Sequence, residues 1–127
     1  MSGILGRILM FKVRKRRRYR AKEGLYVVME NFIEKNQIGD ISLGGLSFYY
    51  VDNGMPLKKS HYDLKVTANS PSASTQILCQ TVSDTEAGEL IFQNKKVKRR
   101  SVKFQRLSQS QKMDLKHIIN DHTLGHL

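Results

Sequence analysis

The sequence lacks the features of a membrane-spanning or disulfide-linked protein. Its one cysteine, Cys79, cannot form a disulfide within the chain and argues against a zinc site built on thiolates. Apolar runs such as residues 8–11 are far shorter than the ~20 residues that cross a bilayer. Arg7 interrupts the first apolar stretch, and the basic run follows that stretch instead of preceding it, unlike a secretory signal. These absences predict a cytoplasmic protein without a transmembrane helix.

Catalytic motifs are also missing. The sequence contains none of the GxGxxG, P-loop, GxSxG and HExxH patterns, and no pair of carboxylates stands out for acid–base chemistry. Cys79 ends the apolar segment 77–79, so we expect a buried, unreactive thiol. His122 and His126 are four residues apart, but no third ligand accompanies them. We therefore predict no catalytic residue, no metal site, no cofactor and no enzymatic activity.

Acidic residues are absent from the beginning of the chain, where no Asp or Glu precedes Glu23. Nine of the 22 Lys and Arg residues lie within the first 22 positions, so most of the net charge of +11 belongs to this segment. A second basic cluster comprises Lys95, Lys96, Lys98, Arg99, Arg100, Lys103 and Arg106. Uncompensated positive blocks indicate an anionic partner, such as nucleic acid, nucleotide phosphates or an acidic membrane surface.

The length of 127 residues suits one domain, which a basic arm precedes. We predict that residues 1–24 form the arm and residues 25–127 form a β-barrel with a C-terminal helix. From Leu25 onward, short β-rich segments alternate with turn residues. The predicted strands are residues 25–29, 37–42, 46–51, 62–66 and 76–83, with one or two more between residues 90 and 106. Regularly spaced strands of this kind favour an antiparallel barrel or sandwich.

The last part of the chain changes to a helical pattern. Ser108 and Gln111 match a capping box, in which each side chain binds the backbone N–H of the other residue. A helix of about 14 residues follows, and Gly125 would end it. The residues on its predicted buried face are Leu115, Ile118, Ile119 and His122.

The segment Asp40–Gly45 combines groups that can recognise a purine. On a strand, Asp40 and Ser42 point to the same face, and the glycines that follow allow a left-handed turn or a close backbone approach. An ionised carboxylate accepts two parallel N–H bonds, and the Watson–Crick edge of guanine presents two such donors side by side. Arginine binds guanine or phosphate through its planar fork. Together with the arm, this segment predicts a guanine-and-phosphate site, whereas a simple Asx or Ser turn is the alternative.

The segment 16–20 contains the pattern RxxxR, and Asp40–Gly45 contains the pattern [D/N]xSxxG. In this order the two motifs resemble the signature of the PilZ domain, a bacterial receptor module for cyclic di-GMP. Residues 99–108 and the predicted helix are similar to the last strand and helix of that family. The resemblance covers residues 14–122. It implies an all-β fold, a six-stranded antiparallel split barrel with a C-terminal α-helix and a flexible basic N-terminal arm.

The resemblance also implies which residues bind cyclic di-GMP. By position, the ligand-binding residues are Arg16, Arg20, Asp40, Ser42 and Gly45. Further candidates are Arg14, Arg17, Arg18 and Gly44, and Arg14 with Arg18 satisfies RxxxR as well as Arg16 with Arg20 does. An arm of like charges should stay mobile until the ligand phosphates neutralise it. Ligand binding would then order the arm and signal to a downstream protein partner.

Two other functions are compatible with the sequence. Small barrels of the OB type bind single-stranded nucleic acid through basic grooves and stacked aromatic rings. Tyr49 and Tyr50 are adjacent and point to opposite faces, so at most one of them faces solvent, which disfavours nucleic acid. The basic arm could also make this protein a peripheral membrane module, because acidic lipids attract such segments. Membrane contact and nucleotide binding do not exclude each other.

Overall fold

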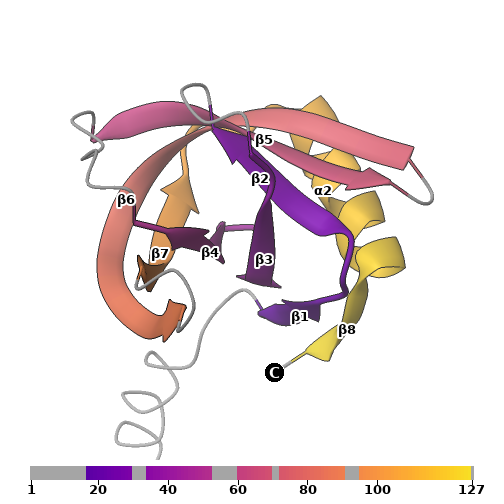
Figure 1. The fold of residues 1–127 in the computed structure, drawn as a ribbon. Coiled ribbons are helices and arrows are strands. Elements are labelled where there is room, and N and C mark those ends of the chain that lie inside the picture. Colours follow the sequence, from indigo (N-terminus) through magenta and orange to yellow (C-terminus); the bar gives the residue numbers. More distant parts are fainter. Residues whose placement is uncertain (1–16, 30–33, 53–59, 70–71, 91–94, 127) are drawn as a thin grey trace, which may run out of the picture.

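The structure is a computed structural model and describes residues 17–29, 34–52, 60–69, 72–90 and 95–126. Figure 1 shows the strands and the helix within these ranges. They are β1 (Tyr19–Ala21), β2 (Leu25–Met29), β3 (Asn36–Ile41), β4 (Gly45–Val51), β5 (His61–Asn69), β6 (Ser72–Leu90), β7 (Lys95–Phe104), α2 (Gln109–His122) and β8 (Thr123–His126). Arg14, Arg16 and most of the predicted arm lie outside the described residues.

Six of the strands form a closed antiparallel barrel. Neighbouring strands are hydrogen-bonded in the order β2-β5-β6-β7-β4-β3, and the pairing of β2 with β3 closes the ring. β1 and β8 extend the sheet beyond β3, and α2 lies against one side of the barrel (Figure 1). The predicted six-stranded barrel and C-terminal helix are therefore confirmed.

Apolar and polar residues alternate along the strands, and the apolar side chains fill the interior of the barrel. In β5, for example, Tyr62, Leu64 and Val66 are buried, while Asp63 and Lys65 between them are exposed. Successive side chains of a strand point to opposite faces, so this pattern gives each strand one core face and one outer face. Fully burying one such Leu or Val contributes roughly 1.5–3 kcal/mol, and the core is therefore the main source of stability.

A charged cluster is also buried on the inner face of β7. Arg100 is 6% exposed, and its Nη2 atom lies 2.7 Å from Oδ2 of Asp84 on β6. The Tyr50 hydroxyl donates to the same carboxylate oxygen at 2.6 Å. The Arg100 guanidinium also lies 5.0 Å from the centre of the Tyr50 ring. A buried guanidinium needs such partners, because removing it from water without them is unfavourable.

The helix begins where the sequence predicts it. The Ser108 side chain accepts from the Gln111 N–H at 3.0 Å, and the Ser108 N–H donates to Oε1 of Gln111 at 2.7 Å. The buried residues of α2 are Leu115, Ile118, Ile119 and His122, as expected. The expected end at Gly125 is wrong, because the chain leaves the helix after His122 and continues as β8.

Two short strands and the length of β6 differ from the sequence prediction. β1 lies within the segment predicted as an arm, and it pairs with β3 on one side and β8 on the other. Gly24, with φ of 94°, forms the turn between β1 and β2, which both lie along the same edge of β3. β6 extends from Ser72 to Leu90 as one strand, beyond its predicted end at residue 83. Two register shifts against β7 accommodate this length.

Candidate functional site

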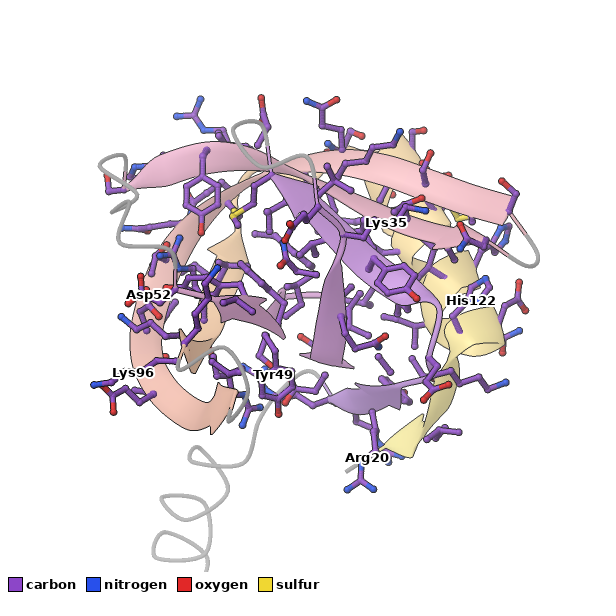
Figure 2. All side chains as sticks on the ribbon, viewed as in Figure 1. Arg20, Lys35, Tyr49, Asp52, Lys96 and His122 are labelled. Carbon is purple, nitrogen blue, oxygen red and sulfur yellow. The ribbon has the colours of Figure 1, made fainter. Side chains whose placement is uncertain are left out.

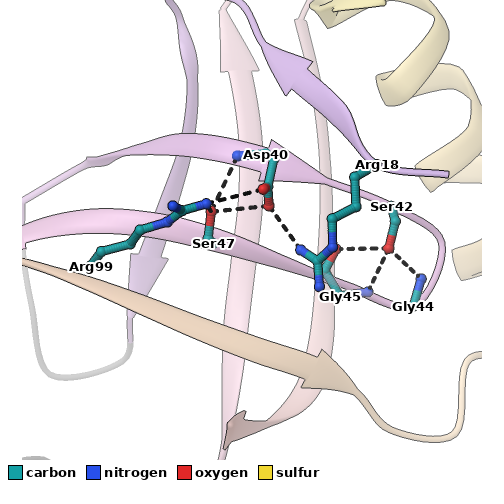
Figure 3. Close-up of polar contacts among 7 residues, drawn as sticks. All are labelled: Arg18, Asp40, Ser42, Gly44, Gly45, Ser47 and Arg99. Carbon is teal, nitrogen blue, oxygen red and sulfur yellow. Dashed lines mark hydrogen bonds and ion pairs between the residues drawn. The ribbon is translucent and has the colours of Figure 1, made fainter. Parts of the chain in front are cut away.

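The Asp40 carboxylate is the centre of a charged cluster on the outer face of the barrel (Figure 3). Its Oδ1 atom accepts from Arg18 Nη1 at 2.9 Å and from Ser47 Oγ at 3.0 Å. Its Oδ2 atom accepts from Arg99 Nη2 at 3.1 Å. Asp40 is only 6% exposed, so these direct partners, and not water, stabilise most of its charge.

The strand register brings these side chains together. Asp40 pairs with Ser47 across β3 and β4, and with Arg20 across β1 and β3. Directly paired residues point to the same face of a sheet, so all three belong to the outer face. On β7, Arg99 pairs with Tyr49, which follows Ser47 by two residues and shares its face. The outer face of β1, β3, β4 and β7 therefore presents one continuous polar surface.

A groove with a volume of about 440 Å³ opens on this surface beside Asp40. Arg20, Asp40, Tyr49 and Arg99 are among its lining residues. Its size falls within the ~300–1,000 Å³ range of small-molecule sites. The Arg99 guanidinium lies 5.8 Å from the centre of the Tyr49 ring, close enough for a cation–π contact. The exposed Glu23 also lines the groove. The Asp40 carboxylate, the two guanidinium groups and the ring can together bind a planar base and a phosphate.

Gly39 makes room for the aromatic ring in this groove. A Cβ atom at Gly39 would lie 3.0 Å from Cε2 of Tyr49 and 3.1 Å from Oγ of Ser47. Such contacts are tighter than ordinary packing, so a larger residue would push the ring or the hydroxyl away from β3. The absence of a side chain here thus helps to set the shape of the groove.

The second arginine of each RxxxR register, Arg18 or Arg20, lies near Asp40. Arg18 forms the ion pair with Asp40, whereas Arg20 is exposed and points away from the barrel (Figure 2). No ion-pair partner for Arg20 is present in the described part of the chain. Arg17 is exposed. The first arginine of each register, Arg14 or Arg16, lies outside the described residues.

Ser42 and the glycines after it form the turn between β3 and β4. The Ser42 hydroxyl accepts from the N–H groups of Gly44 at 3.0 Å and Gly45 at 3.2 Å, and it donates to the Gly45 carbonyl at 3.3 Å. Ser42 is 5% exposed. Its hydroxyl is therefore used within the turn, and the hydroxyl that contacts Asp40 is that of Ser47.

Gly45 is needed because two strands approach closely. A Cβ atom at Gly45 would lie 2.2 Å from the carbonyl oxygen of Val102 on β7. Neither Gly44 nor Gly45 has a positive φ, so the expected left-handed turn is absent at both residues. The other expectation, a close backbone approach, applies here to the neighbouring strand.

Sequence reasoning did not single out Ser47 and Arg99 as site residues. Arg99 was recognisable only as one of seven basic residues near the C-terminus. Ser47 had a clearer signal, because a turn over residues 42–45 implies a hairpin that places Ser47 opposite Asp40. The position of Arg99 depends on the register of β4 with β7, which are far apart in the sequence.

Other features of the described chain do not form a comparable site. A second cavity, of about 540 Å³, lies between β1, β8 and α2, but among the described residues that line it only Lys116 is charged. Within the described ranges, no group of three or more His, Cys, Asp or Glu side chains is arranged to hold a metal ion. Among the residues that the structure describes, no helix is long and apolar enough to cross a membrane. Cys79 is fully buried, as predicted, and burial raises the pKa of its thiol to about 12.

Comparison with known proteins adds one finding at the level of the fold. The sequence matches no protein-family model and no curated protein. The structure is similar to the PilZ domain with c-di-GMP of YcgR from Escherichia coli, with a TM-score of 0.67 and 18% sequence identity. The similarity covers 87% of this chain and 92% of that chain. The chain therefore has a PilZ-like domain fold, as its sequence motifs indicated.

Proposed function

We propose that this protein is a non-enzymatic receptor that binds cyclic di-GMP in the groove beside Asp40. The observation that carries this proposal is the Asp40 carboxylate held at a groove that Arg20 and Arg99 also line. The similar YcgR domain carries c-di-GMP in its structure, which supports the same ligand class here. Cyclic di-GMP is a dianion with two guanine bases, so it needs both an acceptor pair and cationic groups.

Each side chain of the groove has a role in this proposal. Asp40 accepts from the two N–H donors on the Watson–Crick edge of one guanine. Arg20, exposed and beside the groove, binds a phosphate or a guanine through its fork. Arg99 provides a second cation and, with Tyr49, a flat surface for a base.

The remaining predicted residues act around this centre. Arg16 completes the RxxxR pair with Arg20 and adds a contact to the ligand. Ser42, Gly44 and Gly45 keep the turn after β3 in place, and thereby the position of Asp40. Binding orders the basic segment over the groove, and a protein partner recognises the ordered state.

Isothermal titration with cyclic di-GMP, GTP and single-stranded DNA tests the proposal. The wild-type protein should bind cyclic di-GMP saturably, and Arg20→Ala should weaken binding about tenfold or more, because a charge-assisted contact contributes about 1.5–3 kcal/mol. Asp40→Asn should weaken it at least as much, because the amide offers one acceptor oxygen instead of two. The matched controls Lys65→Ala and Asp63→Asn change the same charges on the exposed face of β5 and should leave the affinity nearly unchanged.

Two results would contradict a cyclic di-GMP receptor. One is DNA binding of similar strength with a steep dependence on salt, which would indicate a nucleic-acid-binding barrel. The other is a loss of affinity in Lys65→Ala equal to that in Arg20→Ala, which would show that only the overall positive charge matters. Sedimentation with acidic liposomes, with and without residues 1–12, tests the membrane alternative separately, and unchanged partitioning would exclude an arm-dependent contact.

A further inference from the structure

Side chains of this protein already occupy most of the hydrogen-bonding sites on the Asp40 carboxylate. A carboxylate has two oxygens and about four lone-pair sites. Arg18 and Ser47 occupy both sites of Oδ1, and Arg99 occupies one site of Oδ2. A guanine edge needs a free site on each oxygen, because its two donors lie side by side. One of the two donors to Oδ1 must therefore leave before a guanine can bind there.

Ser47 is poorly suited to leave. It is fully buried on β4, and its hydroxyl also accepts from the Asp40 N–H at 3.3 Å and from Arg99 Nη2 at 3.1 Å. Breaking its bond to Asp40 would leave a buried hydroxyl without an acceptor, which is unfavourable. The strand register also fixes its position opposite Asp40.

Arg18 is better suited to leave Asp40. It lies just before β1, and 27% of its side chain is exposed. Its contact with Asp40 Oδ1 at 2.9 Å is an ion pair with one partly exposed partner, and the N–H donors of a guanine can replace Arg18 at that oxygen.

We infer that Arg18 is an internal competitor of the ligand, which occupies Asp40 until a guanine displaces it. This inference rests on the proposed function, and it assigns to Arg18 a role opposite to that of Arg20. Arg20 contacts the ligand and strengthens binding, whereas Arg18 must first give up its ion pair and thereby weakens binding. The affinity of the site is then set by an exchange of donors on one carboxylate oxygen. This exchange also links the occupancy of Asp40 to the position of the chain before β1.

Calorimetric titration of cyclic di-GMP into four full-length proteins tests this inference. They are the wild type, Arg18→Gln, Arg20→Gln and the control Lys22→Gln, which removes the same charge from an exposed position just after β1. Arg18→Gln should lower the Kd about two- to fivefold, as expected for the loss of a single competing donor. Arg20→Gln should raise the Kd about tenfold or more, and Lys22→Gln should change it little.

A spectroscopic measurement on the wild type provides a second readout. The Arg18 guanidinium protons should exchange slowly with water in the free protein and become fast-exchanging or shifted when cyclic di-GMP is added. This readout needs no variant, so it still tests the role of Arg18 when Arg18→Gln does not fold.

The possible failures are distinguishable. If the wild type does not bind cyclic di-GMP, both the proposed function and the donor exchange at Asp40 are wrong. If the wild type binds but Arg18→Gln raises the Kd more than Lys22→Gln does, Arg18 is a ligand contact and the competitor role is wrong. Arg18 protons that stay protected and unshifted at saturation would overturn the inference as well.

Discussion

Asp40 and Arg99 are 59 residues apart in the sequence and form an ion pair of 3.1 Å. Their strands, β3 and β7, are not neighbours, because β4 lies between them. Arg99 reaches across β4 and also donates to Ser47 on that strand at 3.1 Å. The pair therefore ties three strands together on the outer face, and it fixes the direction of the Asp40 carboxylate.

The first prediction concerns Arg99 in ligand binding. Arg99→Ala should weaken cyclic di-GMP binding about tenfold or more, because the site loses one charge-assisted donor and Asp40 loses the donor that holds its Oδ2 atom. Calorimetry measures the effect, and Lys103→Ala is the control, since Lys103 is an exposed cation on the same strand. If both variants lose affinity equally, Arg99 acts through net charge and has no specific position in the site.

A second prediction separates two roles of Gly45. Gly45→Ala should destabilise the protein by about 1–3 kcal/mol, because the new Cβ atom would force β4 away from Val102. Gly88→Ala is the matched control, since a Cβ atom there meets nothing within 4 Å. Urea unfolding measures both. A stable Gly45→Ala protein that fails to bind cyclic di-GMP would instead show that Gly45 matters only for the ligand.

The buried and the exposed ion pairs on β6 and β7 should differ in their contribution to stability. Asp84→Ala leaves the guanidinium of Arg100 buried without its carboxylate and should lower the free energy of unfolding by about 3 kcal/mol. Glu86→Ala removes the partner of Lys96 in a pair whose side chains are 64% and 58% exposed, and it should cost less than about 1 kcal/mol. Chemical unfolding of both variants checks the difference. Equal losses would mean that Arg100 is stabilised mainly by its other contacts.

The stability should fall at alkaline pH through Tyr50. Burial, with the hydrogen bond to Asp84, raises the pKa of Tyr50 from 10.0 to about 12. A group whose pKa is higher in the folded state contributes its full stability below the unfolded pKa and loses it as the pH rises through the folded pKa. The free energy of unfolding should therefore decline between pH 10 and pH 12.

Unfolding curves measured across this pH range test the role of Tyr50. Tyr50→Phe should flatten the decline, although not completely, because burial also raises the pKa of Tyr62. Tyr49→Phe is the control at an adjacent, exposed ring and should keep the wild-type decline. A decline of equal slope in Tyr50→Phe and the wild type would assign the alkaline loss to other groups.

The parts of the fold that depend on local patterns were predictable from the sequence. The alternation in residues 62–66 predicted β5, and the Ser108–Gln111 capping box predicted the start of α2. β1 and β8 were not predicted, because each has only three or four residues and forms by pairing with the other across almost the whole sequence. Strands this short have no periodicity of their own to detect.

The candidate site shows the same division. The motif residues Asp40 and Arg20 were singled out by residue type and spacing, and the structure places them opposite each other. The contacts of Ser47, Arg99 and Arg18 with Asp40 arise from strand register and side-chain reach, which the chemical type of a residue does not encode. A basic run indicates that an anion is near but does not indicate which guanidinium meets it.

β1 is hydrogen-bonded along both edges, to β3 beside the groove and to β8 after the helix. The Lys22 N–H that follows β1 also donates to the carbonyl of His122, the last residue of α2, at 2.9 Å. If a nucleotide bound to Arg20 displaces β1, the backbone hydrogen bonds from β1 and Lys22 to β8 and His122 should weaken, and hydrogen–deuterium exchange would detect this. A protein that recognises β8 would thus sense the nucleotide without touching it.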